Sequence, residues 1–163
     1  MTNSRRGKSE GRWDDPVATS SGSEREFAGA DGVKPMPSYG MTKIVDLSYQ
    51  EAVDKVTDAL KAQGFGVLTT INVQDTLKQK LGVDRGEYVI LGACNPQLAH
   101  QALQAEPEIG LLLPCNVIVY TSEGKTRVSV LDPQQALGIS NNDALSPIAK
   151  QAKERLERAL AAV

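Results

Sequence analysis

The two cysteines of this 163-residue chain are each followed directly by an asparagine, and no other stretch concentrates reactive side chains to the same degree. The first pair lies in Gly92-Ala93-Cys94-Asn95-Pro96 and the second in Pro114-Cys115-Asn116. A thiolate is a nucleophile and a soft metal ligand, and an amide side chain both donates and accepts hydrogen bonds. The candidate ligand-binding residues are therefore Cys94, Asn95, Cys115 and Asn116, and the two cysteines are also the candidate catalytic residues.

Three interpretations of the cysteines stay open. In the first, Cys94 and Cys115 form a redox pair or carry sulfur as a persulfide, and a helix that begins at Pro96 lowers the pKa of the Cys94 thiol by favouring its anion. In the second, both thiols are inert packing side chains, since free cysteine is among the most buried residue types. In the third, they form a stable disulfide.

A metal site would have to join both cysteines to His100, the single histidine. Soft metals take such ligands, but the sequence has no closely spaced pair of cysteines and no evident fourth ligand. We therefore predict no metal site and a solvated His100. The phosphate-binding, dinucleotide-binding and nucleophile-elbow motifs are also missing from the sequence, which identifies neither a cofactor nor a reaction.

The two asparagines differ in what the sequence predicts for them. Asn95 precedes Pro96 and suits the N-cap of a helix, which explains it without any ligand. Asn116 interrupts an apolar strand next to Pro114-Cys115 and has no comparable structural reason. We expect it to face a ligand pocket or the backbone of a neighbouring strand.

Apolar runs flank both Cys-Asn pairs, at residues 88–91 before Cys94 and at residues 117–120 after Cys115. If these runs are neighbouring antiparallel strands, the two thiols lie at the same end of the sheet. A helix over residues 96–105 rises about 15 Å, and the apolar segment 109–114, read as a buried connection, can span that distance in reverse. We expect the sulfur atoms to lie within about 10 Å of each other, whereas a disulfide needs Cα atoms within about 7 Å.

Capping residues predict the remaining helices. Ser48 and Glu51 form a capping box that opens a helix ending at Gly64. A short helix is expected between Asp75, as its cap, and Gly82. Ser146-Pro147 opens the last helix, which runs to the end of the chain.

Alternating apolar residues predict the strands. They cover residues 43–46, 65–73, 87–94, 115–121 and 126–131, with a turn at 123–124 and an irregular segment at 134–142. In the strand at 65–73 we expect one face to hold Phe65, Val67, Ile71 and Val73. The pattern indicates an α+β domain, in which the first and last helices cover one face of an antiparallel sheet.

The N-terminal part differs in composition from the rest. Residues 1–40 contain no leucine or isoleucine and are rich in glycine, serine and proline, so we expect a disordered or extended tail. Residues 41–163 are long enough for a single α+β domain with a sound core.

Charge and hydropathy exclude several classes of protein. Lysine and arginine number 18 against 20 aspartates and glutamates, a net charge of −2, so we expect no nucleic-acid partner. No apolar run approaches the length of a membrane span, and no apolar region follows Arg5-Arg6 as it would in an export signal. With only two cysteines, the cytoplasm is the expected compartment.

Two long motifs resemble a known bacterial and archaeal family. They are the run from Tyr88 to Pro96 and the run from Glu108 to Tyr120, supported by Thr76-Leu77-Lys78 and Asp132-Pro133. The family is domain of unknown function 302 (DUF302). The resemblance covers residues 43 to about 160. It implies the order β-α-β(4)-α, a fold of the TATA-binding-protein class and a homodimer, and it implies no established activity.

Three functions fit these expectations. The first is a cytoplasmic small-ligand-binding or accessory domain, with a pocket near the paired Cys-Asn motifs. The second is a thiol-based redox enzyme or sulfur carrier that uses Cys94 or Cys115. The third is a structural homodimeric interaction module.

Overall fold

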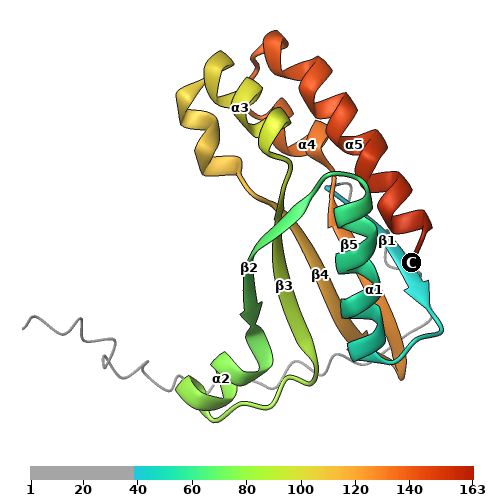
Figure 1. Cartoon of the computed structure of the whole chain (residues 1–163). Helices are drawn as coiled ribbons and strands as arrows, with labels where there is room; N and C mark the ends of the chain where they lie inside the picture. Colours follow the sequence, from blue (N-terminus) through green and yellow to red (C-terminus); the bar gives the residue numbers. More distant parts are fainter. Residues whose placement is uncertain (1–38) are drawn as a thin grey trace, which may run out of the picture. The chain divides into compact units, whose positions relative to one another are not determined.

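The computed structural model describes residues 39–163, so the tail predicted for residues 1–40 lies almost wholly outside the described part (Figure 1). Five strands form one sheet in the order β1-β5-β4-β3-β2, and every neighbouring pair is antiparallel. The strands are β1 (Gly40–Val45), β2 (Gly66–Asn72), β3 (Tyr88–Cys94), β4 (Cys115–Ser122) and β5 (Lys125–Leu131). The predicted α+β class and the order β-α-β(4)-α are confirmed.

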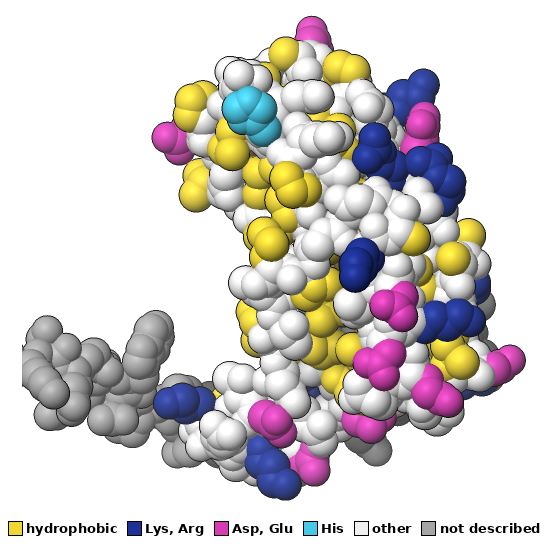
Figure 2. Space-filling view, viewed as in Figure 1, with side chains coloured by type: hydrophobic (Ala, Val, Ile, Leu, Met, Phe, Trp, Pro, Cys, Tyr) yellow, Lys and Arg dark blue, Asp and Glu magenta, His cyan; other side chains and the backbone are white. Residues whose placement is uncertain are grey.

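Helices connect and cover the strands. The α-helices are α1 (Tyr49–Ala62), α2 (Val73–Leu81), α3 (Pro96–Ala105), α4 (Pro133–Gly138) and α5 (Ser146–Ala161), and two 3₁₀ helices are η1 (Pro107–Leu112) and η2 (Asp143–Leu145). Helices α1 and α5 lie over the same face of the sheet (Figure 1). Acidic and basic side chains are spread over the solvent side of this helical layer (Figure 2).

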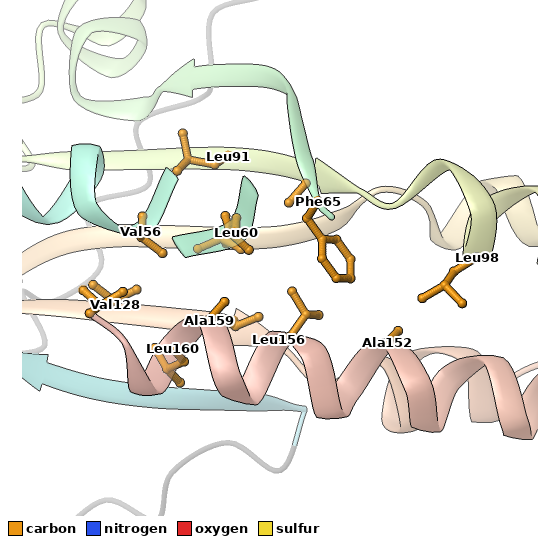
Figure 3. Close-up of a cluster of buried hydrophobic side chains, with 14 of the residues drawn as sticks. Val56, Leu60, Phe65, Leu91, Leu98, Val128, Ala152, Leu156, Ala159 and Leu160 are labelled. Atoms are coloured by element: carbon orange, nitrogen blue, oxygen red, sulfur yellow. The ribbon is translucent and has the colours of Figure 1, made fainter. Parts of the chain in front are cut away.

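The core lies between these two helices and the sheet. Val56 and Leu60 of α1 meet Leu156 of α5 and Leu91 of β3 there, and each is at most 2% exposed (Figure 3). Alternation along a strand sends every second side chain to this core face, so the residues between them form the opposite face, here called the outer face. In β3 the core face holds Val89, Leu91 and Ala93.

The capping box predicted for the first helix is present. The Ser48 hydroxyl accepts the backbone N–H of Glu51, and the Glu51 carboxylate accepts the backbone N–H of Ser48, so two unpaired donors of the first turn are satisfied. The short helix α2 begins earlier than predicted, because Asn72 rather than Asp75 is its N-cap: the Asn72 Oδ1 accepts the N–H of Asp75 at 3.0 Å.

The face predicted for the second strand is wrong in its second half. A β-bulge between Val67 and Thr69 makes Leu68 an extra residue, and a bulge changes which side chains share a face. Val67 therefore pairs with Ala93 on the core face, whereas Ile71 pairs with Ile90 on the outer face. Val73 belongs to α2.

The segment predicted as irregular, residues 134–142, begins inside a helix. Asp132 caps α4 by accepting the N–H of Gln134 at 2.9 Å, and Pro133 stands at the first helical position. The other carboxylate oxygen of Asp132 accepts a hydrogen bond from Lys153 of α5 at 2.6 Å. This hydrogen bond raises the pKa of the Lys153 ammonium. The cap and the ion pair tie α4 to α5.

The connection before β4 is also more regular than predicted. It contains the 3₁₀ helix η1, in which Ile109 is buried but Leu111 is 82% exposed, so the segment is not a wholly buried connection. Helix α5 begins at Ser146-Pro147 as predicted, but its N-cap is Leu145, which makes no side-chain hydrogen bond. The reason is that η2 runs directly into α5.

Candidate functional site

The two cysteines lie on adjacent antiparallel strands at the same end of the sheet, as the sequence predicted. Cys115 pairs with Ala93, and Cys94, one residue further along β3, pairs with Gly66 of β2. Alternation then directs Cys115 to the core face and Cys94 to the outer face. Both thiols are free. This arrangement disfavours a disulfide, and the sharing of one ligand by both thiols stays a prediction.

Burial keeps both thiols protonated at neutral pH. It raises the pKa of Cys115 to about 11, with a smaller contribution from the Cys94 thiol nearby. Burial also raises the pKa of Cys94. A helix N-terminus would lower the pKa of Cys94, and the shift runs in the opposite direction because of burial. The capping N–H of α3, that of Leu98, is taken by Asn95 and not by the thiol.

We therefore expect slow alkylation of the native protein. At pH 7 a thiol with a pKa near 11 is ionised in about one molecule in ten thousand. Iodoacetamide should label Cys94 slowly and Cys115 only after unfolding in urea, with mass spectrometry of tryptic peptides as the readout. The rate at Cys94 should rise with pH up to and beyond its ordinary pKa. Rapid labelling of either cysteine at pH 6 would contradict this assignment and support a reactive thiolate.

Asn95 is a buried structural residue, 5% exposed. Its Oδ1 accepts the N–H of Leu98 at 3.1 Å, which caps α3 as predicted. Its Nδ2 donates to the carbonyl oxygen of Gly64 at 3.0 Å, which links the start of α3 to the turn between α1 and β2. Both ends of the amide are occupied, so a ligand would have to displace one of these bonds.

Asn116 stands apart from the cysteine pocket. It pairs with Gly92 across β3 and β4, is exposed, and belongs to the outer face, opposite to the face of Cys115. Gly92 itself is closely covered: a Cβ at this position would lie 2.2 Å from the Oγ1 of Thr69 and 2.9 Å from the Cγ of Pro114. A ligand-binding role of Asn116 stays a prediction, and it would concern the outer face.

A narrow apolar slot borders the two cysteines on the helical side of the sheet. Its free volume is about 30 Å³, and its walls include Phe65, Leu98, Ala102, Leu113, Cys115 and Leu137. Figure 3 shows Phe65 and Leu98 side by side along the helix α5. A volume of this size holds a water-sized group, far less than a typical ligand site of at least about 300 Å³.

A larger pocket, which no sequence motif predicted, lies on another side of α4. It measures about 310 Å³ and is formed by α4, η2 and the start of α5, with Leu137 shared between it and the slot. Gln134, Asn141, Asp143 and Ser146 line it together with apolar side chains. The run Ser140-Asn141-Asn142-Asp143 is the signal that could have indicated it, since such clusters form polar loops.

The outer face carries an apolar and aromatic surface on β2, β3 and β4, and β5 separates it from Ile44 of β1. One cross-strand row is Ile71, Ile90 and Ile118. A second row is Tyr88, Tyr120, Arg127 and Ile44. The Tyr88 and Tyr120 rings stack with centroids 5.4 Å apart, and the guanidinium of Arg85 lies 5.2 Å above the Tyr88 ring.

Other candidate chemistry is scattered. Within residues 39–163, no three side chains of the histidine, cysteine, aspartate and glutamate types gather as a metal ion would require. His100 is exposed on α3. In the same range, every helix is too short or too polar to cross a membrane.

The fold and the Cys-Asn end of the sheet define an α+β protein with a five-stranded antiparallel sheet and one helical layer. The family model described as "Domain of unknown function DUF302" matches residues 41–163, and the chain belongs to this family. It is similar to a solved structure of an uncharacterized conserved DUF302 protein from Bacillus stearothermophilus, with 34% identity and a TM-score of 0.72 over 76% of this chain and 97% of the other. A search of curated proteins found no match. The resemblance inferred from the sequence is therefore confirmed, and the family description assigns no specific function.

Proposed function

We propose that residues 41–163 act as a homodimeric accessory domain in the cytoplasm and that the outer face of the sheet is its association surface. The observation that carries this proposal is the apolar character of that face. An antiparallel sheet with one side in water normally carries polar residues on that side. Here Ile71 exposes 49% of its surface, and its row continues through Ile90 and Ile118, with two tyrosines beside them. Ile44, at 48%, lies beyond Arg127 of β5.

The charges of the outer face support association with a second copy. Arg127 is held by Glu123 at 3.0 Å, at the hairpin between β4 and β5, and Arg85 stacks on Tyr88. The isoleucine row itself contains no charged side chain, and these two arginines lie beside it. Large apolar patches of this kind on a soluble domain mark interaction sites, and a self-complementary patch suits a two-fold dimer.

Light scattering at micromolar concentration tests the dimer, with an expected mass of twice that of one chain. Ile118→Lys places a charge in the middle of the isoleucine row and should convert the dimer to a monomer while leaving the circular dichroism spectrum unchanged. Ile139→Lys is the matched control, since Ile139 is 70% exposed at the end of α4 and lies outside this surface. A monomeric unmodified protein would refute the proposal, as would loss of the dimer in the control alone.

A second candidate is a small-ligand site at the cysteine end of the sheet, which the apolar slot supports. Its walls suit a small apolar group rather than a polar metabolite. The alternative of a thiol-based enzyme or sulfur carrier has less support, because the raised pKa values of Cys94 and Cys115 leave little thiolate at neutral pH.

A further inference from the structure

The pocket formed by α4, η2 and the start of α5, here called the α4–α5 pocket, has a volume of about 310 Å³. This volume is at the lower end of the range of ligand sites, about 300 to 1,000 Å³. Leu137, Leu145 and Ala149 are buried and supply apolar wall, and Gln134, Asn141, Asp143 and Ser146 supply polar groups. A mixed lining of this type suits a small molecule with one polar end.

The charge of the lining is negative. Asp143, which is exposed, is the one side chain with a formal charge among the lining residues, which include no lysine or arginine. The two salt bridges of the described residues join other groups, so the Asp143 carboxylate has no cationic side chain within reach there. Asn142 adds no free group, because its Oδ1 accepts the N–H of Ala144 and its Nδ2 donates to Glu106.

The start of α5 does not offset this negative charge. A helix N-terminus attracts anions through its unpaired N–H groups. In α5 the first N–H, of Ser146, donates to the carbonyl of Asp143, and the second residue, Pro147, has no N–H. Two of the donors that an anion would use are therefore unavailable. The Gln134 amide and the Ser146 hydroxyl can each donate or accept a hydrogen bond, so the Asp143 carboxylate alone sets the charge preference of the lining.

We propose that the α4–α5 pocket binds a small organic cation, a primary ammonium on a short aliphatic chain. The ammonium donates to the carboxylate of Asp143 and to neighbouring oxygen acceptors, and the aliphatic chain lies against Leu137 and Leu145. A charge-assisted hydrogen bond to a carboxylate is the strongest contact that the lining offers. This site is independent of the dimer surface, which lies on the outer face of the sheet.

The test is a ¹H–¹⁵N NMR titration of the full chain with n-butylammonium chloride, at constant ionic strength. Sodium butyrate and n-butanol serve as probes of matched size with a negative charge and with none. Butylammonium should shift the backbone amide signals of Leu137, Leu145 and Ser146 along a saturable curve in the millimolar range. Butyrate should leave these signals unchanged, and butanol should bind about two- to fivefold more weakly, because the Asp143 carboxylate is exposed.

Two variants distinguish binding of butylammonium in the pocket from its general attraction to the negatively charged protein. Asp143→Asn should weaken butylammonium binding about two- to fivefold, because it removes the carboxylate and an exposed ion pair contributes no more than this. Asp58→Asn removes the same charge from an exposed position on α1 and should leave the affinity unchanged. The proposal is overturned if the three signals do not saturate with butylammonium, if butyrate shifts them equally, or if the two variants bind alike.

Discussion

Replacing Asn95 by alanine should lower the free energy of unfolding by about 1 to 3 kcal/mol. Loss of an N-cap costs about 1 kcal/mol, and here the cap of α3 is lost. The Gly64 carbonyl also loses its donor, but Gly64 is exposed and water can replace the amide, so this loss adds about 0.5 to 1.5 kcal/mol, the net value of an ordinary hydrogen bond. Urea denaturation measures the effect as a fall in the midpoint at an unchanged slope.

Asn116→Ala is the matched control for this variant. It removes the same side chain from the other Cys-Asn pair, but Asn116 is exposed, so the expected change is within about 0.5 kcal/mol. Asn95→Asp keeps the oxygen that caps α3 and removes the donor to Gly64. Its loss of unfolding free energy should therefore lie between those of Asn95→Ala and Asn116→Ala. Equal effects at positions 95 and 116 would contradict the structural role of Asn95 and return it to the ligand-binding candidates.

Replacing Gly92 by alanine should cost about 1 to 3 kcal/mol of stability, the range for an overpacked site. The added Cβ would stand 2.2 Å from the Oγ1 of Thr69 and 2.9 Å from the Cγ of Pro114. The threonine can rotate, but the proline ring is rigid and joins β4. We expect β3 and β4 to separate locally, so that amide hydrogen exchange at the paired residues Gly92 and Asn116 becomes faster.

A double-mutant cycle identifies the contact that causes this loss. Thr69→Ala alone should be nearly neutral, since Thr69 is exposed on the edge strand. In the Gly92→Ala background it should restore part of the stability, giving a coupling energy of about 0.5 kcal/mol or more. If the two changes in unfolding free energy are strictly additive, Thr69 is not the side chain that the new Cβ meets. Gly66→Ala is the control for placing alanine in a strand, because a Cβ at Gly66 would meet no atom within 4 Å.

These two predictions change how the Cys-Asn motif is understood. Gly92 is required by close packing and Asn95 by its two hydrogen bonds, so two of its five residues have structural causes. Pro96 is a third residue with a structural cause, because it begins α3. None of these causes applies to Cys94 or Asn116, and both lie on the outer face of the sheet.

Local patterns in the sequence were sufficient for the elements and their order. The capping box of Ser48 and Glu51, the Asn95-Pro96 start of α3 and the Glu123-Gly124 turn act over a few residues. Both turn residues have positive φ, 54° and 71°, as a tight hairpin requires. Such signals depend on the chain's immediate neighbours, and so the sequence alone determined the α+β class and the pairing of the strands that hold the cysteines.

Contacts between distant segments decided the rest. The bulge at Leu68 adds one residue to β2 relative to β3. A local sequence pattern could not predict it, because the bulge depends on how many residues of β3 lie opposite. The pKa of Cys115 depends on α3 and α4 closing over it, and the faces of Cys115 and Asn116 depend on the register of β4 with β3. The α4–α5 pocket is formed by residues of α4, η2 and the start of α5, which only the packed chain brings together. Side-chain burial and register are properties of the packed chain, and for that reason only the tertiary structure could show which candidate residues remain free to act.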